Sequence, residues 1–325
     1  MVGLLYEMTN KGFAKWIVIV IIELVLLLGI LTGISLTRSH SKALMFEIPQ
    51  EQRMDYSNER ILALEDSLYW NFVNHRFILI HDKEGVLQWV KIDNAFGRHD
   101  YDFDSTLIDE GYFKYYTEDG QVTSTVGIDV SKYQGTIDWS QVKAAGVDFA
   151  FVRVGYRGYG NGSIRLDETY DYNVAEALKN DLDVGVYFYS QATSYEEGVE
   201  EARFVLEQVK AYNINLPIVL DTEDAMDDSA RTANLTPEQR SEACRGFLET
   251  IESAGYETMI YANLSWIALE LDISQFYGYD IWFAQYANEP RLPYEYKIWQ
   301  YTAEGTVPGI SQPVDLNIGF DFYGE

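Results

Sequence analysis

The sequence predicts an α/β protein whose largest part is a TIM-like (β/α)5(β)3 barrel, preceded by a transmembrane helix and a small β-containing unit. Three observations support this: an almost uncharged run at 16–36, paired β-type runs between residues 71 and 124, and apolar runs that alternate with amphipathic segments from residue 126 onward. The predicted boundaries are a short cytoplasmic segment at 1–15, the span at 16–36, a stalk with the small unit at 37–124, and the barrel at 125–325.

Composition limits the possible functions. The formal net charge is −27 over 325 residues, which argues against nucleic-acid binding because that requires a basic face. Cys244 is the single cysteine, so no intramolecular disulfide can form, and we expect it to be a small buried residue. The four histidines all precede residue 100 and show no paired metal-ligand spacing. The histidines thus indicate no metal ligands, and we expect no cofactor.

The apolar run at 16–36 has the length of a membrane span. At ~1.5 Å per residue its helix would be about 31 Å long, close to the thickness of a hydrocarbon core. A secretory signal is usually shorter, and no clean cleavage site follows the run. Lys11 and Lys15 precede it and Arg38 and Lys42 follow it, so the flanking charges do not fix its orientation.

The next segment predicts a charged helical stalk at 45–70 and then two hairpins. "RFILI" and "VLQWVKI" flank the turn "HDKEG", and "YFKYY" and "QVTST" flank "TEDG". Between them, residues 100–111 resemble a calcium loop but have Ser105 where the loop glycine belongs and Gly111 where its glutamate belongs. This favours a solvated acidic loop.

The barrel prediction rests on eight strand candidates with helix signals between the first five. Asp138 with Gln141 is typical of a helix N-cap, as are Ser194 and Thr236, and little room remains for full helices after the fifth strand. The strand candidates are Val126–Val130, Phe149–Gly155, Val184–Ser190, Pro217–Glu223, Thr258–Ala262, Ile281–Tyr286, Lys297–Tyr301 and Val314–Ile318.

Carboxylates gather at the predicted active-site end of this barrel. In such barrels the active site lies at the C-terminal ends of the strands. Alternation along the strand "IVLDTED" places Asp221 and Glu223 on the inner face. Asp129 ends the first strand and Asp315 lies in the last, and these strands are neighbours in a closed barrel. We therefore expect four carboxylates in one cleft.

Such a cluster suits acid catalysis. Crowded carboxylates cannot all ionise easily, so at least one pKa should rise. A protonated carboxyl beside an ionised one is what glycoside cleavage needs, because one acid protonates the leaving oxygen and an anion stabilises the oxocarbenium-like centre. Four acids can instead bind a divalent metal. The absence of histidine from the barrel segment disfavours zinc or iron and leaves magnesium open.

The ordered motifs of residues 126–320 resemble the glycoside hydrolase family 25 lysozymes, which are N-acetylmuramidases. A D-x-E pair alone would be a weak signal, but the whole set stands in the family's order. It comprises "GIDVSKYQGTIDW", "FAFVRVGYRGYG", "GVYFYS", "PIVLDTED", "YANLSWI", "IWFAQY" and "KIWQYTAEGTVPGISQPVDLN".

This resemblance implies hydrolysis of the β-1,4 bond between N-acetylmuramic acid and N-acetylglucosamine in peptidoglycan. It makes Glu223 the general acid, with Asp221 orienting the substrate acetamido group or tuning Glu223. Asp129 and Asp315 would supply negative charge and hydrogen bonds around the reacting sugar. Whether a protein nucleophile or the substrate's own acetamido group attacks stays open. The aromatic residues expected at strand ends, where some would contact the glycan, are Tyr187, Tyr189, Tyr261, Trp282, Tyr286, Trp299 and Tyr301.

The implied substrate also implies a location. Because peptidoglycan lies outside the membrane, we expect a single-pass cell-membrane protein, anchored through 16–36, with an extracellular catalytic domain. The expected partners are peptidoglycan glycan strands and the membrane, with no nucleic acid, and the sequence identifies no protein partner. The resemblance does not cover residues 71–124, which suit a spacer, a wall-binding module or a partner-binding surface.

Two alternatives remain at this point. The first is a non-catalytic glycan-binding or scaffolding protein on the same barrel, against which the complete acid set argues. The second is a different barrel glycosidase, such as a chitinase-like enzyme, which should show a D-x-x-D-x-D-x-E run. Ile218, Val219 and Leu220 precede Asp221, so that run is absent.

Overall fold

The computed structural model describes residues 75–320, apart from Glu84, Asp104 and Ser105. The predicted membrane span at 16–36 and the predicted stalk at 45–70 lie outside the described residues. Within the described part, no helix is both long and apolar enough to cross a membrane.

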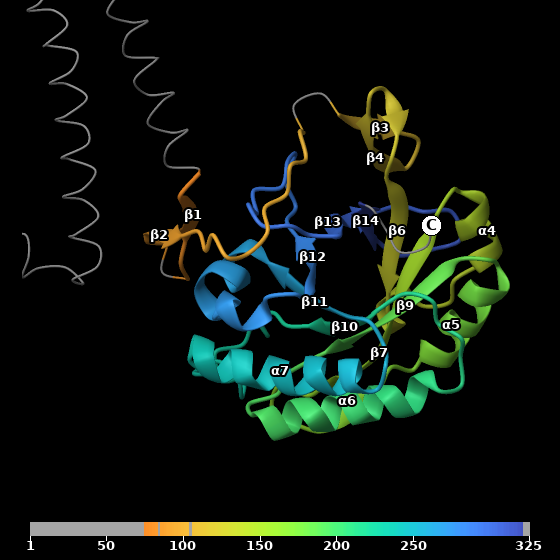
Figure 1. Cartoon of the computed structure of the whole chain (residues 1–325). Helices are drawn as coiled ribbons and strands as arrows, with labels where there is room; N and C mark the ends of the chain where they lie inside the picture. The colour runs from red at the N-terminus through yellow and green to blue at the C-terminus, as the bar shows by residue number, and fades with distance from the viewer. Residues whose placement is uncertain (1–74, 84, 104–105, 321–325) are drawn as a thin grey trace, which may run out of the picture. The chain divides into compact units, whose positions relative to one another are not determined.

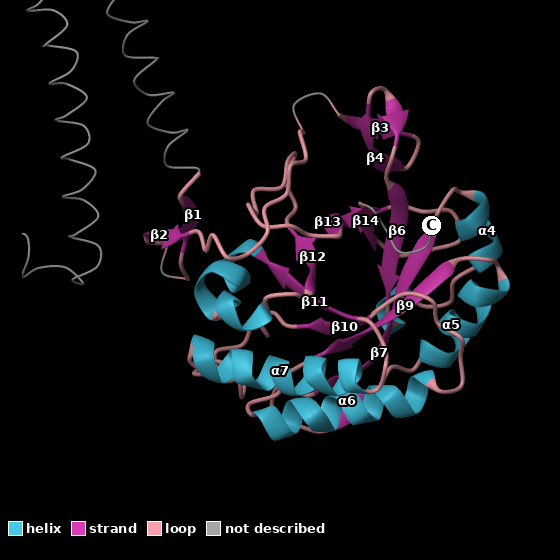
Figure 2. Ribbon diagram, in the orientation of Figure 1, coloured by secondary structure: helices cyan, strands magenta, loops and turns pink. Residues whose placement is uncertain are grey.

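A closed barrel of eight strands forms the centre of the described structure (Figures 1 and 2). Neighbouring strands follow one another in sequence, and pairing between the first two, β6 and β7, closes the barrel. All pairs are parallel except those of the last strand, β14, which is antiparallel to both β13 and β6. The strands are β6 (Thr125–Val130), β7 (Phe149–Arg157), β9 (Asp183–Tyr189), β10 (Ile218–Asp221), β11 (Thr258–Asn263), β12 (Asp280–Ala284), β13 (Ile298–Gly305) and β14 (Val314–Gly319).

Helices cover the outside of the barrel after each of its first four strands (Figure 2). They are α4 (Trp139–Ala144), α5 (Tyr170–Lys179), α6 (Tyr195–Val209) and α7 (Pro237–Ser253). The predicted caps are confirmed at their starts, where Asp138, Ser194 and Thr236 each accept a backbone N–H bond. The fifth connection contains a short π-helix at Trp266–Glu270 and a 3-10 turn at Ile273–Phe276 in place of a full α-helix.

The eight predicted strands are confirmed, with changes at their ends. Glu223 and Tyr286 lie beyond the ends of β10 and β12, in the loops at the mouth of the barrel. A short extra strand, β8 (Ile164–Leu166), pairs with the end of β7. The sequence pattern could not reveal the antiparallel direction of β14, because alternation is the same in both directions.

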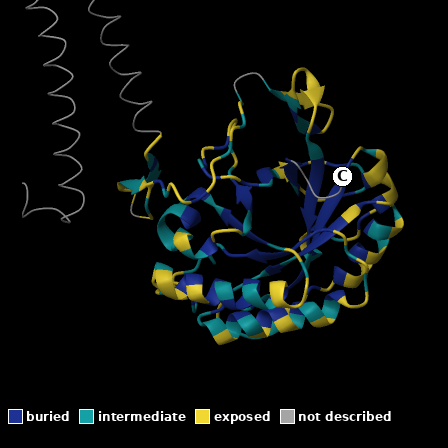
Figure 3. Cartoon of the chain, viewed as in Figure 1, coloured by how far each residue is buried: buried dark blue, intermediate teal, exposed yellow. Residues whose placement is uncertain are grey.

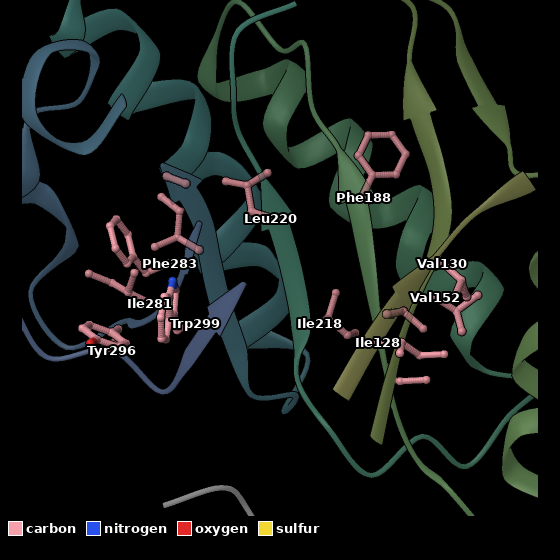
Figure 4. Close-up of a cluster of buried hydrophobic side chains, with 14 of the residues drawn as sticks. Ile128, Val130, Val152, Phe188, Ile218, Leu220, Ile281, Phe283, Tyr296 and Trp299 are labelled. Atoms are coloured by element: carbon pink, nitrogen blue, oxygen red, sulfur yellow. The ribbon is translucent and has the colours of Figure 1, made fainter. Parts of the chain in front are cut away.

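Two apolar layers lie on the two faces of the barrel wall. One packs between strands and helices and includes Ile128, Ile218 and Leu220, drawn in Figure 4. The other fills the barrel interior below the cavity, around Phe149 and Phe151. The strands of the barrel are almost entirely buried, whereas the helices expose their outer faces (Figure 3).

A glycine on the inner face of β6 shows how tightly this interior is filled. A Cβ at Gly127 would lie 2.0 Å from the Phe149 ring. A larger residue at this position would therefore displace the Phe149 ring from the barrel interior.

The segment before the barrel forms two small sheets within the same compact unit. β1 (Phe77–His81) and β2 (Leu87–Lys91) make one predicted hairpin, and β4 (Phe113–Glu118) and β5 (Gln121–Val122) make the other. β3 (Leu107–Glu110) adds a strand to β4, so this part of the predicted acidic loop is extended structure.

The second sheet is attached to the barrel by aromatic packing. The ring of Tyr101 stacks on that of Phe320 with centroids 4.3 Å apart, and the Tyr301 hydroxyl accepts the backbone N–H of Lys114 at 3.1 Å. These contacts fix β4 and the segment before β3 against the end of the barrel.

Candidate active site

A cavity of about 950 Å³ opens at the mouth of the barrel, where the parallel strands end and β14 begins. All four predicted carboxylates line it, although they come from positions far apart in the chain. Its lining residues are Asp129, Ser131, Tyr133, Gln134, Arg153, Tyr156, Arg157, Gly158, Tyr159, Gly160, Asn161, Tyr187, Tyr189, Asp221, Glu223, Ala225, Tyr261, Trp282, Tyr286, Gln300 and Asp315.

Asp129 and Asp315 face each other across the β6–β14 pair, where they are direct register partners. Asp129 is buried, and its Oδ2 accepts hydrogen bonds from Gln300 Nε2 at 2.9 Å and from Asn317 Nδ2 at 2.8 Å. Two donors on one oxygen favour the ionised form. Asp129 is therefore the carboxylate best prepared to carry a negative charge in this cavity.

Asp221 and Glu223 come from the end of β10 and the loop after it. Asp221 is buried, and its Oδ1 has no hydrogen-bond partner among the described residues. Thr222, between them, points the other way and accepts the indole N–H of Trp266 at 2.9 Å. This alternation holds both acids on the cavity side.

Arg153 on β7 lines the cavity, and its positive charge lowers the pKa of Asp221 against the larger effect of burial. Its Nη2 lies 2.7 Å from Asp167 Oδ2 and its Nε donates to the same oxygen at 2.8 Å. The guanidinium also lies 5.1 Å from the centre of the Tyr133 ring. Because Asp167 already balances its charge, Arg153 only partly offsets the cavity's negative potential.

The sequence predicts that at least one pKa in the cluster should rise, and burial raises the pKa of all four acids, with neighbouring carboxylates adding to the rise for Glu223, Asp221 and Asp315. Burial raises the pKa of Asp129 to about 6, against the two hydrogen bonds that lower it. Burial and the nearby Asp129 raise the pKa of Glu223 to about 7 and that of Asp315 to about 8. Burial, followed by Glu223 and Asp129, raises the pKa of Asp221 well above its ordinary value.

These shifts divide the acids by protonation state near neutral pH. Asp129 ionises first, whereas Glu223 holds its proton up to about pH 7. A cavity that keeps one carboxyl protonated beside an ionised one can donate a proton and stabilise a developing positive charge at the same time.

Five of the seven predicted aromatic residues line the cavity. Tyr187, Tyr189, Tyr261 and Trp282 project inward from their strands, and Tyr286 stands at the rim. The Tyr261 and Tyr286 hydroxyls lie 2.9 Å and 3.0 Å from Gln300 Oε1, which holds both rings against the cluster.

The other two, Trp299 and Tyr301, do not line the cavity. Ile298 and Gln300 of β13 face inward, so alternation turns Trp299 and Tyr301 to the outer face. Trp299 is fully buried there in the cluster of Figure 4, and its indole N–H donates to the Gln285 carbonyl at 2.9 Å. Neither ring therefore faces a sugar bound in this cavity, unlike the other five aromatic residues.

Three polar residues of the site were missed in the sequence. Asn317 stands two positions after Asp315, and Gln300 two after Ile298, so alternation along β14 and β13 could have found both. Arg153 sits two positions after Phe151 on the inner face of β7. The cavity wall at 156–161 comprises the end of β7 and the turn after it, and most of it lies within the motif "FAFVRVGYRGYG".

No group of three or more histidine, cysteine, aspartate and glutamate side chains in the described part of the chain is arranged to hold a metal ion.

Known proteins are similar to this chain over the same region. Autolytic lysozyme of Clostridium acetobutylicum is 24% identical over 192 residues, which cover 59% of this chain and 54% of that protein. Lysozyme M1 of Streptomyces globisporus is 26% identical over 202 residues, covering 59% of this chain and 66% of its own length. The chain thus spans little more than half of the first of these relatives.

Solved structures agree on the fold. The crystal structure of the bacterial lysozyme from Streptomyces coelicolor superposes with a TM-score of 0.51 at 26% identity, covering 62% of this chain and 93% of that one. The sequence profile of glycosyl hydrolases family 25 matches residues 128–310, more than half of the chain. With the closed barrel and the four acids at its mouth, these similarities show that the chain belongs to glycosyl hydrolase family 25, a family of glycosidases.

Proposed function

We propose that this protein is a membrane-anchored lysozyme that hydrolyses the β-1,4 bond between N-acetylmuramic acid and N-acetylglucosamine in peptidoglycan and so remodels the cell wall. The observation that carries the proposal is the gathering of Asp129, Asp221, Glu223 and Asp315 in one cavity at the mouth of the barrel, where burial raises the pKa of Glu223 above that of Asp129. Family membership and the lysozymes among its relatives support the choice of bond.

Glu223 is the general acid of this proposal. It lies in the loop after β10 at the cavity's edge, and its pKa of about 7 keeps it protonated under mildly acidic conditions. Protonation of the glycosidic oxygen makes the departing sugar a neutral alcohol, which lowers the barrier to bond cleavage.

The other three acids act on the sugar ring that develops positive charge as the glycosidic bond breaks. Asp129, held by Gln300 and Asn317, faces the growing positive charge of the oxocarbenium-like centre as a carboxylate. Asp221 offers Oδ1, which has no partner among the described residues, as an acceptor for the substrate acetamido N–H. Asp315, opposite Asp129, adds negative potential or a donated hydrogen bond according to its protonation.

The membrane anchor and location form a separate part of the proposal. The run at 16–36 would hold the protein in the cell membrane with a short cytoplasmic N-terminus and the barrel outside. Carbonate extraction of membranes should leave the full chain in the pellet, and protease added to spheroplasts should degrade the barrel. A barrel protected from that protease would overturn the orientation.

Analysis of released ends tests the reaction itself. The full chain, purified in detergent, is incubated with peptidoglycan, and the products are reduced and identified by mass spectrometry. We compare the parent with Glu223→Gln and with Asp228→Asn, an exposed carboxyl in the same loop. The parent and Asp228→Asn should release new reducing muramic acid ends, and Glu223→Gln should release none.

Other outcomes of this experiment distinguish between the alternative functions. New reducing glucosamine ends would mean the same chemistry at the other bond of the strand. Binding to peptidoglycan without released ends over a broad pH range would replace the enzyme with a glycan-binding scaffold. Full activity of Glu223→Gln would remove Glu223 from the role of acid.

A further inference from the structure

A second hollow, of about 650 Å³, lies beside the catalytic cavity. One wall comes from the β3–β4 hairpin, which precedes residues 128–310 and so lies outside the family match. The other wall comes from the ends of β12, β13 and β14. The residues that line it are Asp109, Gly111, Tyr112, Phe113, Lys114, Tyr286, Ala287, Asn288, Tyr301, Thr302, Glu304, Gly305, Thr306 and Leu316.

Tyr286 joins this hollow to the catalytic cavity, because it lines both. Its hydroxyl lies 3.0 Å from Gln300 Oε1, whereas 59% of the residue is exposed. The ring is thus fixed at its polar end and presents an apolar face at the boundary. The two hollows are therefore adjacent at Tyr286.

Tyr112 provides a second aromatic surface on the opposite wall. It is 53% exposed at the turn between β3 and β4. Its ring meets the Phe113 ring edge-on with centroids 6.1 Å apart, and Phe113 is buried. The next residue, Lys114, donates its backbone N–H to the Tyr301 hydroxyl on the barrel. The turn that carries Tyr112 is therefore attached to the barrel on one side.

We propose that this hollow is a distal glycan subsite, in which the β3–β4 hairpin and Tyr286 hold sugars of the same strand beyond the bond that is cut. The inference rests on the proposed function, since it concerns the same substrate. Tyrosine rings offer flat apolar faces to pyranose rings, and Asn288, Thr302 and Thr306 add amide and hydroxyl groups for sugar hydroxyls and acetamido groups.

The charges of the hollow favour this occupant over an anionic polymer. Asp109 and Glu304 line it, and the single lysine of its lining, Lys114, is already paired with Asp109 at 2.8 Å. N-acetylglucosamine is uncharged, and so is N-acetylmuramic acid when its lactyl carboxyl is held in an amide bond, as it is where a stem peptide is attached. Such sugars avoid the repulsion that a phosphate-rich chain would meet here. A glycan strand is also a polymer, so its uncut part must continue out of the catalytic cavity along some surface.

Binding to chains of two lengths tests the proposal. The full chain carrying Glu223→Gln, which prevents consumption of the ligand, is titrated calorimetrically with N-acetylmuramic acid–N-acetylglucosamine oligomers whose lactyl carboxyls are converted to amides, a tetrasaccharide and a decasaccharide. Adding Tyr112→Ala should weaken binding of the decasaccharide by about tenfold, as expected for one aromatic contact. Binding of the tetrasaccharide should not change.

Two control variants distinguish the loss of the aromatic ring from a disturbance of the hairpin's fold. Tyr112→Phe keeps the stacking face and should bind the decasaccharide like its parent. Ile108→Ala changes another exposed side chain of the same hairpin that does not line the hollow, and it should also leave binding unchanged. Equal losses for both chain lengths, or no loss with Tyr112→Ala, would overturn the distal subsite.

The proposed function can fail separately from this inference. If the parent releases no reducing ends while decasaccharide binding depends on Tyr112, the distal subsite is supported and the proposed hydrolysis is wrong. If the parent hydrolyses peptidoglycan and Tyr112→Ala binds both oligomers as its parent does, the proposed hydrolysis is supported and the distal subsite is wrong. Failure of both oligomers to bind would overturn both.

Discussion

The ammonium group of Lys83, in the turn between β1 and β2, lies 3.0 Å from a carboxylate oxygen of Asp224, the residue after Glu223. It also lies 5.8 Å from the centre of the Trp266 ring. Asp224 is one of the charges that raise the pKa of Glu223, after burial and Asp129. A residue from outside the family match therefore partly neutralises a charge that acts on the proposed general acid.

The first prediction concerns this ion pair. Lys83→Met leaves Asp224 ionised but uncompensated, so the pKa of Glu223 rises and the alkaline limb of kcat/KM against pH moves to higher pH. The movement is a fraction of a pH unit because the pair is partly exposed and screened by solvent. Asp224→Asn should move the same limb to lower pH, and Lys83→Arg should leave it in place. If the alkaline limb stays in place in all three variants, the pair does not act on Glu223.

The parent's own pH profile follows from the two best-separated acids. Asp129 must be ionised, and its pKa is raised by burial to about 6, so kcat/KM should rise through about pH 6. Glu223 must be protonated, and its pKa is raised by burial and Asp129 to about 7, so kcat/KM should fall through about pH 7. A soluble fluorogenic glycan measures this profile, and its limbs belong to the coupled cluster as a whole. Activity that rises steadily to pH 9 would contradict the assignment of Glu223 as acid.

Asn317→Leu tests what holds Asp129 in its ionised form. The change keeps the side-chain volume but removes the N–H that reaches Asp129 at 2.8 Å, so the pKa of Asp129 rises further and the acid limb moves to higher pH. The loss of one hydrogen bond to a charge should lower kcat about tenfold. The variant also removes the acceptor of the Trp282 indole, at 2.8 Å.

A buried pair far from the site provides the matched control. Asn173 accepts the indole N–H of Trp139 at 3.2 Å, so Asn173→Leu imposes the same kind of loss on the fold. It should lower the melting temperature without moving either limb of the pH profile. If Asn317→Leu behaves in the same way, its role is structural and not electrostatic.

Much of this site was readable from the sequence because two periodicities are strong. The βα alternation fixed the order of the strands, and strand alternation placed Asp221 and Glu223 on one face. Closure of the barrel then brought Asp129 and Asp315 together, as their direct pairing confirms. These rules are local or topological, so one sequence is enough to apply them.

The features that the sequence could not predict depend on contacts between side chains that are far apart in the chain. Nothing in the sequence around Tyr101 indicates that its ring stacks on Phe320 or that the β3–β4 hairpin lines the second hollow. Lys83 and Asp224 are likewise 141 positions apart in an exposed pair that no pattern marks. Such contacts follow from the tertiary packing of loops, which has no sequence period.

The outward position of Trp299 leads to a prediction that separates stability from binding. Trp299→Phe opens space in the outer core and removes the N–H bond to Gln285, so the protein should lose about 1–3 kcal/mol of stability. KM for peptidoglycan fragments should stay unchanged. The matching variant on the inner face is Trp282→Phe. Because Trp282 lines the catalytic cavity, this variant should change kcat/KM. A raised KM for Trp299→Phe would restore this residue to the glycan groove.

The last prediction concerns a buried ion pair behind the cavity wall. Arg157 donates Nε–H to Glu201 Oε1 at 2.7 Å and Nη1–H to the Gly162 carbonyl at 2.8 Å. Glu201 is fully buried, so Arg157→Met leaves its carboxylate without its partner, which typically costs about 3–5 kcal/mol. A lower melting temperature in calorimetry measures this loss.

The same pair gives this loss a pH dependence with a definite sign. Burial raises the pKa of Glu201 to about 7 even beside Arg157, so its contribution to stability is complete below its ordinary pKa and declines as pH rises through about 7. Without Arg157 the carboxyl keeps its proton more firmly, and Arg157→Met should lose more stability at pH 8 than at pH 5. Arg245→Met, which breaks the exposed pair with Glu249, should cost ~0–0.5 kcal/mol at both pH values. Equal losses for the two variants would mean that Arg157 contributes no more than a surface charge.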